Sequence, residues 1–163
     1  MIKTLDEVVK EVAKQKKLGK KVGLITGCFD ILHFGHVQLF RFAKKHCDFL
    51  VVGLDSDKTI ALSKGKGRPV NSINHRLEVI SELRSVDIVF PITANLYYED
   101  TVKAHLIFEQ IIGKIRPDCL ITNVLADDYW KEKQVRAKKM GIDFKGEKRK
   151  KMTSTTEIVF KLD

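Results

Sequence analysis

Short, uninterrupted apolar runs alternate along this chain with segments whose apolar residues have helical spacing. The runs lie at residues 22–26, 49–53, 86–90 and 119–122, and a weaker one lies at 142–144. Strands that are apolar throughout must be covered on both faces, and strands separated by helices pair in parallel. We therefore predict an α/β fold with a five-stranded parallel sheet and helices on both faces.

The expected helices fill the gaps between these strands. The first begins at a capping-box spacing, because Thr4 stands three residues before Glu7, and Gly19 suits its end. The others are expected from about His36 to Ala43, from Asn71 or Ser72 toward Arg84, from Val102 to Ile115, and from Tyr129 to Met140. Pro91 should end the third strand, and residues 63–69 should form a flexible basic loop.

No repeat or linker divides the 163 residues. We expect one domain over residues 1–163, with an N-terminal helix in 1–20 and a core in 22–163. The amphipathic first helix could also pack against a second copy, so a homodimer is an expectation.

Composition narrows the class of protein. No apolar run is long enough to span a bilayer, and the first residues are too polar for a secretory signal. Cys28, Cys47 and Cys119 are odd in number and widely spaced, which favours reduced thiols and a cytoplasmic location.

A formal net charge of +9 raises the question of nucleic acid. Much of the charge lies in two runs, residues 14–21 and 145–151, without interleaved aromatic residues. A base-stacking surface needs such aromatics, so nucleic acid is not the expected partner, and small anionic substrates explain the charge as well. A basic module that binds nucleic acid or nucleotide without turnover is the alternative from another class.

The segment Gly27-Cys-Phe-Asp-Ile-Leu-His-Phe-Gly-His36 joins the first strand to the next helix. Ligands bind at the carboxyl ends of parallel strands, and a helix N-terminus directs free N–H groups at an anion. His33 and His36 flank Gly35, so both rings can face one anion while the chain approaches closely. The segment therefore predicts a nucleotide-phosphate site, with Gly27 and Gly35 at its turn.

This segment closely resembles the His-x-Gly-His signature of the cytidylyltransferase-like nucleotidyltransferase superfamily. Further matches follow in order, including "GLDSD", "KGKGRPVN", "HRLEVISELRSVDIVFP", "RPDCLI" and "STTEI". Within the superfamily, the chain is most similar to adenylyltransferase domains that act on D-glycero-β-D-manno-heptose 1-phosphate. The resemblance implies a Rossmann-like fold and the transfer of a nucleoside monophosphate with release of pyrophosphate.

The resemblance also assigns roles around the first motif. Backbone near Cys28 and Phe29, with His33 and His36, would hold the nucleotide phosphates. Lys64 or Lys66 would reach the triphosphate, with Lys66 as the catalytic candidate. Asp30 and Arg84 are candidates for supporting the acceptor. Asp30 could also orient this turn or the water shell of the metal, and a structural role in the turn is the favoured one.

A second signature lies near the C-terminus. Ser154, Thr155 and Thr156 resemble its hydroxyl-rich helix start, which suits phosphate oxygens. Arg149 falls where some relatives carry a phosphate-binding arginine, although Lys148, Lys150 or Lys151 could serve equally.

The implied chemistry needs no general base. A phosphate monoester is mostly dianionic at neutral pH, because its second pKa is about 6. Mg²⁺ is implied as a cofactor carried by the phosphates, with no direct protein ligand. Cys28 and the Gly-Arg-Pro-Val-Asn loop favour ATP over CTP as the donor.

One turn departs from the resemblance. Relatives that act on heptose phosphate carry a Lys-Gly-Gly-Asp-Tyr-like turn after the fourth strand, whereas residues 123–130 here read Asn-Val-Leu-Ala-Asp-Asp-Tyr-Trp. The acceptor contacts are therefore expected from Asp128 and Tyr129, with Asp127 and Trp130 as further candidates. The resemblance implies a phosphorylated sugar or polyol as the acceptor, and a cytidylyltransferase for glycerol 3-phosphate is the nearest alternative.

Overall fold

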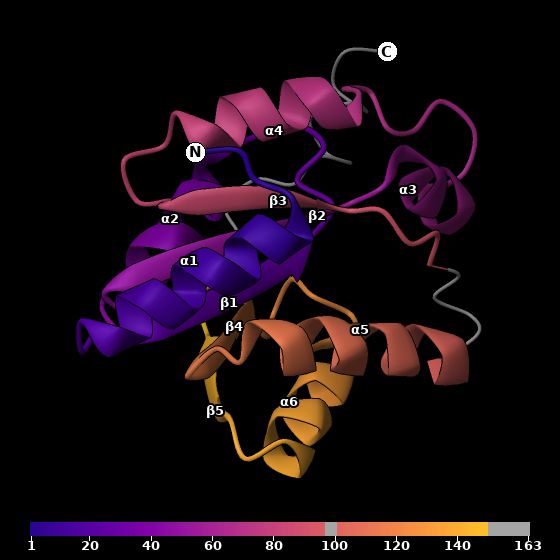
Figure 1. Ribbon diagram of the computed structural model, residues 1–163. Coiled ribbons are helices and arrows are strands. Elements are labelled where there is room, and N and C mark those ends of the chain that lie inside the picture. Colours follow the sequence, from indigo (N-terminus) through magenta and orange to yellow (C-terminus); the bar gives the residue numbers. More distant parts are fainter. Residues whose placement is uncertain (97–100, 150–163) are drawn as a thin grey trace.

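The computed structural model describes residues 1–96 and 101–149. They form a five-stranded sheet in the order β3-β2-β1-β4-β5, and every pairing is parallel (Figure 1). The strands are β1 (Val22–Gly27), β2 (Phe49–Asp55), β3 (Ile88–Ile92), β4 (Cys119–Asn123) and β5 (Asp143–Glu147). The predicted α/β fold with five parallel strands is confirmed.

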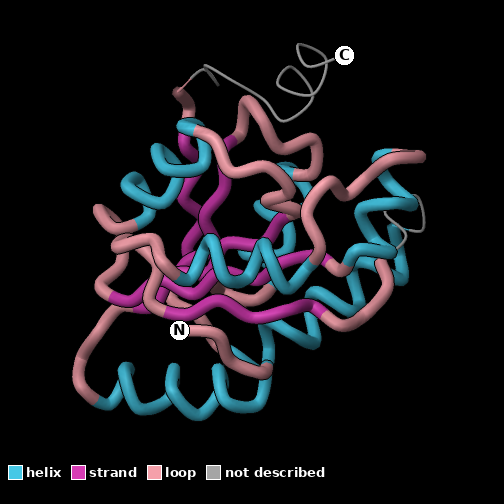
Figure 2. Tube along the Cα trace, turned by 90° about the horizontal axis from the view of Figure 1, so that it is seen from above, coloured by secondary structure: helices cyan, strands magenta, loops and turns pink. Residues whose placement is uncertain are grey.

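Helices cover both faces of the sheet (Figure 2). One face packs against α1 (Leu5–Lys17), α5 (Thr101–Ile115) and α6 (Trp130–Lys139). The other packs against α2 (Phe34–Ala43) and α4 (Ile73–Ser81). Neighbouring strand residues alternate between the two cores, as Leu24 and Ile25 do in β1, so every central strand is apolar on both sides.

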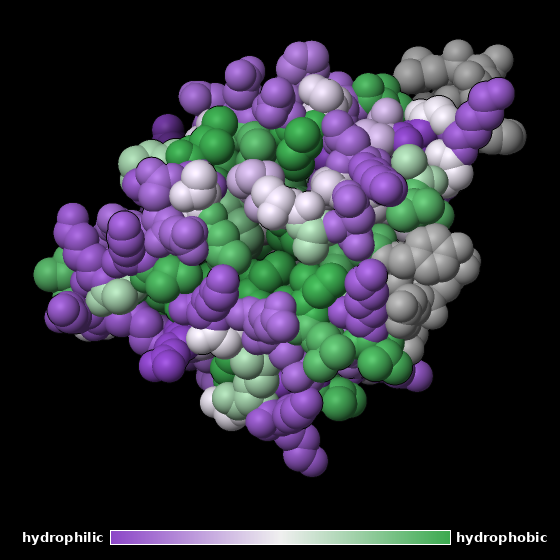
Figure 3. All heavy atoms as spheres, turned by 45° about the vertical axis from the view of Figure 1, so that its right-hand side comes forward, coloured by the Kyte–Doolittle hydropathy of each residue, from purple (hydrophilic) through white to green (hydrophobic). Residues whose placement is uncertain are grey.

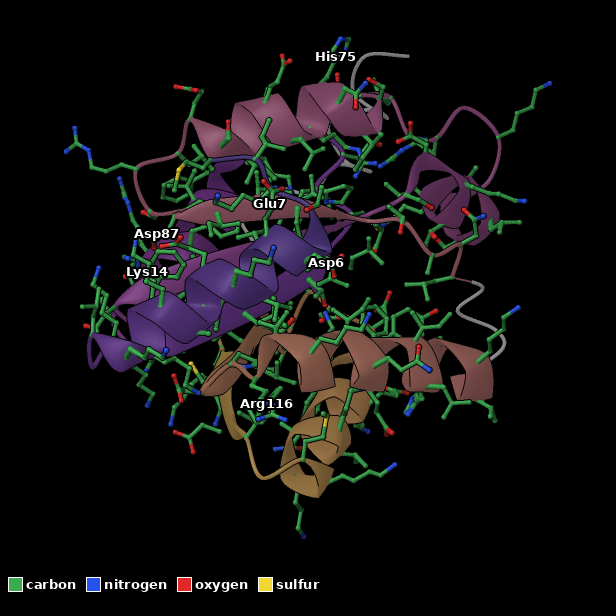
Figure 4. The ribbon with its side chains drawn as sticks, in the orientation of Figure 1. Asp6, Glu7, Lys14, His75, Asp87 and Arg116 are labelled. Atoms are coloured by element: carbon green, nitrogen blue, oxygen red, sulfur yellow. The ribbon has the colours of Figure 1, made fainter. Side chains whose placement is uncertain are left out.

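The first helix forms as its capping pattern indicated. Thr4 and Glu7 make both bonds of the capping box, and Gly19 has a φ of 77° just beyond the helix end. Asp6 and Glu7 lie at the start of α1 and Lys14 near its end, which suits the helix dipole (Figure 4). Val8 and Val12 are buried in the chain's own core, so the apolar face of α1 is already used within the molecule.

Residues 1–3 reach the outer edge of the sheet. Ile2 bridges Val89 in parallel, Lys3 N–H donates to the carbonyl of Val89 at 3.0 Å, and Val89 N–H donates to the carbonyl of Met1 at 2.9 Å. Pro91 was expected to end β3, but the strand continues to Ile92 and Pro91 pairs with Leu54. Since β3 is an edge strand, a residue without an N–H is tolerated on its outer side.

Two helix boundaries differ from the sequence prediction. An additional helix, α3 (Asp57–Lys64), is capped by the Ser56 hydroxyl and occupies the start of the expected basic loop. The helix expected to run toward Arg84 ends at Ser81, and Arg84 lies in the turn before β3. None of the described helices combines the length and apolarity that a bilayer crossing requires.

Candidate active site

The order of the strands creates one crevice. The chain moves outward from β1 through β2 to β3, then crosses to β4 and β5 on the other side. Ligands bind at such a switch point, outside the carboxyl ends of the two strands that flank it. A cavity of about 290 Å³ lies there, between the ends of β1 and β4. The side of the molecule that carries α3 and the start of α5 is hollowed, with apolar atoms at its centre and hydrophilic atoms around them (Figure 3).

The turn after β1 forms one wall of this cavity. A side chain at Gly27 would bring a Cβ to 3.2 Å from the Phe29 ring, and Phe29 itself has a φ of 48°. The Phe29 ring lies 5.0 Å from His36 and 5.4 Å from Phe40. Gly27, Cys28, Phe29 and Gly35 all line the cavity, so the turn that the sequence singled out is at the crevice.

His33 and His36 come together at the start of α2. His33 is the N-cap residue and is buried, and its ring stacks on that of His36 with centroids 3.8 Å apart. The backbone N–H of His33 donates to His36 Nδ1 at 3.4 Å. Both rings line the cavity beside a helix N-terminus, where backbone N–H groups have no intrahelical acceptor. This arrangement can receive an anion.

Asp30 lines the cavity, and its carboxylate is held by the loop after α3. Its carboxylate accepts from Arg68 Nε at 2.6 Å and from the N–H groups of Val70 and Asn71, both at 2.9 Å. The side chain of Asn71 also donates to the carbonyl of Asp30 at 2.8 Å. Asp30 therefore ties the loop after α3 to the turn after β1, and it places Arg68 at the cavity.

Arg76 of α4 supports the backbone of the site from outside the cavity lining, and the sequence did not predict this role. Its buried guanidinium donates to the carbonyls of Cys28 at 2.6 Å and Asp55 at 2.8 Å, and to Asp57 Oδ1 at 2.7 Å. His75 lies on the outer side of the same helix (Figure 4). Residues 73, 76, 77 and 80 share helical spacing, so an arginine on an otherwise apolar helix face was the available signal.

The remaining basic candidates differ in position. Lys64, the last residue of α3, lines the cavity, whereas Lys66 is exposed in the following turn and is not part of the lining. Arg84 borders a separate hollow with Arg41 and is absent from the lining of the cavity. The structure therefore does not bring Arg84 to the crevice, and the arginine that α4 supplies is Arg76.

The C-terminal candidates are only partly described. Arg149 is 57% exposed and lies near Glu147, with 3.6 Å between Nε and Oε1, and its carbonyl accepts from Asn123 at the end of β4. Ser154, Thr155 and Thr156 lie outside the described residues, as do Lys150 and Lys151.

The loop after β4 forms the opposite wall. Asp128 and Tyr129 line the cavity, as the expected acceptor contacts should. Asp127 also lines the cavity, and its carboxylate accepts from the Thr122 hydroxyl, from Lys133 Nζ at 2.7 Å and from the Tyr129 N–H at 3.0 Å. Burial raises the pKa of Asp127, but the charge of Lys133 and these hydrogen bonds outweigh it and hold the pKa below the ordinary value.

Two further features define the chemistry. Burial, and then the neighbouring Asp55, raise the pKa of the Cys28 thiol to about 12, so Cys28 is neutral at physiological pH and unsuited to nucleophilic attack. Within residues 1–96 and 101–149, no three histidine, cysteine or acidic side chains come together in a way that could hold a metal ion.

Comparison with known proteins gives a consistent result. A family profile described as "Cytidylyltransferase-like" matches residues 24–161. The bifunctional protein HldE of Haemophilus influenzae is 35% identical over 159 residues, which is 96% of this chain and 30% of that protein. HldE of Paramagnetospirillum magneticum is 40% identical over 77% of this chain and 23% of that protein. The chain thus spans less than a third of the length of these relatives.

Solved structures share the fold. The lipopolysaccharide core biosynthesis protein from Thermoplasma volcanium has a TM-score of 0.61 at 30% identity, over 82% of this chain and 100% of that one. A bifunctional NMN adenylyltransferase/ADP ribose pyrophosphatase from Francisella tularensis has a TM-score of 0.65 at 16% identity, over 87% of this chain and 42% of that one. At that identity the likeness concerns the fold alone.

Proposed function

We propose, since the chain belongs to the cytidylyltransferase-like family, that it transfers a nucleoside monophosphate to a phosphorylated small molecule and releases pyrophosphate. The donor we propose is ATP, and the acceptor is a phosphorylated sugar such as D-glycero-β-D-manno-heptose 1-phosphate. The sequence resemblance to heptose-phosphate adenylyltransferase domains supports this acceptor. So does the likeness to a protein named for lipopolysaccharide core biosynthesis.

The observation that carries the proposal is the stacked pair of His33 and His36 at the N-terminus of α2, facing the switch-point cavity. Imidazole N–H and helix N–H groups can donate to phosphate oxygens from this wall. An oxygen of the acceptor phosphate would attack the α-phosphorus, and the bond to the leaving pyrophosphate would break. The acceptor phosphate is already dianionic, so the site needs positioning and charge neutralisation rather than a base.

Cations near the cavity suit this chemistry. Lys64 and Arg68 line it, and Lys66 would reach the triphosphate from its exposed turn. Mg²⁺ would enter with ATP, held by phosphate oxygens, and would neutralise part of their charge. This suits a site in which Asp30 and Asp127 are already engaged by protein donors. Roles for Arg149 and residues 154–156 in holding phosphate remain part of the proposal.

The test is pyrophosphate release from ATP or CTP with each of several acceptors, including heptose 1-phosphate and glycerol 3-phosphate. We expect release with ATP and a sugar phosphate, whereas CTP with glycerol 3-phosphate would favour the alternative cytidylyltransferase. Nucleotide binding without release under any pairing would contradict the enzymatic proposal and favour a binding module.

His36→Ala tests the role of the histidine pair. Loss of one preorganised donor should lower the rate by roughly 10²–10³-fold. His75→Ala is the matched control, because His75 is exposed on α4 and outside the cavity. A wild-type rate for His36→Ala would refute the proposed role.

A further inference from the structure

Glu132 lies in the first turn of α6 and lines the cavity. Its Oε2 atom is buried, yet it accepts no hydrogen bond from any residue in the described ranges 1–96 and 101–149. No described lysine or arginine forms an ion pair with it within the same ranges. A carboxylate oxygen in this state is costly unless something else supplies a donor.

The neighbouring cations are directed elsewhere. Lys133 Nζ donates to the carbonyl of Thr26 at 3.0 Å and to Asp127 at 2.7 Å. Arg136 follows Glu132 by one helical turn, but its guanidinium lies over the Phe108 ring, 4.9 Å from the centroid. The Oε2 atom of Glu132 therefore receives no hydrogen bond from either side chain, and Glu132 is among the residues that line the cavity.

The chemistry of the group restricts what can meet it. A phosphate would be repelled by the carboxylate, so the phosphate end of a substrate belongs at the histidine wall. A hydrogen-bond donor is needed at Glu132, and substrates of the proposed kind carry hydroxyls. Both the ribose of the nucleotide and the sugar part of the acceptor supply them.

We propose that Glu132 accepts a hydrogen bond from a hydroxyl of the bound substrate and thereby selects for a hydroxyl-bearing ligand at the α6 wall. The inference rests on the proposed function, because it assumes that a nucleotide and a sugar phosphate occupy this cavity. It assigns their phosphate ends to α2 and a hydroxyl-bearing part to α6. The hydroxyl belongs either to the ribose or to the acceptor, and binding experiments distinguish these sources.

The first arm measures the dissociation constants of ATP, 2′-deoxy-ATP and 3′-deoxy-ATP by calorimetry without acceptor. A hydrogen bond to a charged group corresponds to about 10–100-fold in binding. If the ribose is the source, wild type should bind one deoxynucleotide about 10–100-fold more weakly than ATP. Glu132→Met should then bind ATP as weakly as that deoxynucleotide and no longer discriminate between them.

The second arm measures the KM for heptose 1-phosphate. If the acceptor is the source, Glu132→Met should raise this KM about 10–100-fold while leaving the affinity for ATP unchanged. Glu132→Gln keeps the shape and a weaker acceptor, so it should give a smaller effect in the same arm. It also keeps the test valid if the methionine variant folds poorly.

The matched control is Glu109→Met. Glu109 lies on α5 outside the cavity and pairs with Lys139 at 2.8 Å, so both arms should be unchanged. The inference is overturned if neither arm changes in either Glu132 variant. It is also overturned if ATP and both deoxynucleotides weaken alike. Wild type could release no pyrophosphate and still bind a deoxynucleotide more weakly than ATP, with this difference lost in Glu132→Met. In that case the inference stands and the proposed reaction fails.

Discussion

Arg76 shows how one side chain can set the backbone of a site. Its guanidinium donates to the carbonyl groups of Cys28 after β1, Asp55 at the end of β2 and Asn71 before α4, and to the carboxylate of Asp57. The planar fork of arginine offers several donors at fixed angles, which a lysine cannot reproduce. The carboxyl ends of β1 and β2 are thus held together from beneath the cavity.

Replacing Arg76 should therefore be severe. Arg76→Met leaves buried carbonyls and a carboxylate without their donor, and it should lower the free energy of unfolding by about 3–5 kcal/mol. Arg76→Lys should recover only part of this loss. Urea titrations at pH 7 measure both, with Arg84→Met as the control, because an exposed arginine should change stability by less than about 0.5 kcal/mol. Wild-type stability in Arg76→Lys would show that the fork is not needed.

For individual site residues, the sequence predicted some positions and missed others. Two histidines around a glycine, after an apolar strand, indicated a shared site, and His33 and His36 do stack at the cavity. Their role in binding phosphate stays a prediction. Arg76 was missed because charged residues are normally assigned to solvent, and its partners are mostly backbone groups far away in sequence. Asp30 was placed in the right turn, but tertiary hydrogen bonds decide its use.

At the level of elements, α6 is joined to β1 and to the loop after β4 through Lys133. Its ammonium group bonds the carbonyl of Thr26 and the carboxylate of Asp127, and both charged side chains are mostly buried. The loop that carries Asp128 and Tyr129 is therefore held at a fixed distance from the end of β1.

Lys133→Met should break this tie and lower the free energy of unfolding at pH 7 by about 1.5–3 kcal/mol. In wild type the folded-state pKa of Asp127 is depressed. Its contribution to stability is therefore present above the ordinary value of 3.8 and is lost as the pH falls through the folded value. Without Lys133, burial should raise this pKa, and protonation should remove the unpaired charge.

The difference in the free energy of unfolding between wild type and Lys133→Met should therefore become smaller below pH 4. Urea titrations between pH 7 and pH 3 follow it. Lys139→Met is the control: Lys139 lies on α6 like Lys133, but its pair with Glu109 of α5 is at the surface, so its loss should cost less than about 1 kcal/mol. A deficit that is independent of pH would contradict the assignment.

The helices and strands were predicted better in type than in their boundaries. The periodicity of apolar residues was sufficient for the five strands, but α3 was hidden between a strand and a glycine-rich loop. The Ser56 cap, whose hydroxyl accepts from the N–H of Thr59 at 3.1 Å, was the missed signal. The continuation of β3 through Pro91 depends on strand order, which local sequence does not contain.

At the scale of the whole molecule, the thiols of Cys28, Cys47 and Cys119 couple stability to alkaline pH. Burial is the main cause that raises the pKa of Cys28 and Cys47 to about 12 and that of Cys119 to about 11, from an ordinary 9.0. A raised folded-state pKa favours the protonated thiol, so the stability it contributes is complete below pH 9 and is lost as the pH rises beyond it.

By pH 10 each thiol should remove about 1.4 kcal/mol from the free energy of unfolding, or about 4 kcal/mol for the three. The double variant Cys47→Ala/Cys119→Ala retains only Cys28 and should lose about 1.4 kcal/mol over the same range. Urea titrations at pH 8, 9 and 10 compare the two slopes. Equal slopes would mean that these thiols do not stay protonated in the folded chain.

The edge formed by β3 also limits how copies of this chain can associate. Both backbone groups of Val89 are already bonded to residues 1–3, and Pro91 has no N–H to offer. A strand from another molecule therefore cannot form a continuous row of backbone hydrogen bonds with β3. Exposed edge strands are otherwise common routes to aggregation. A homodimer of this protein is therefore not expected to form by continuing the sheet beyond β3.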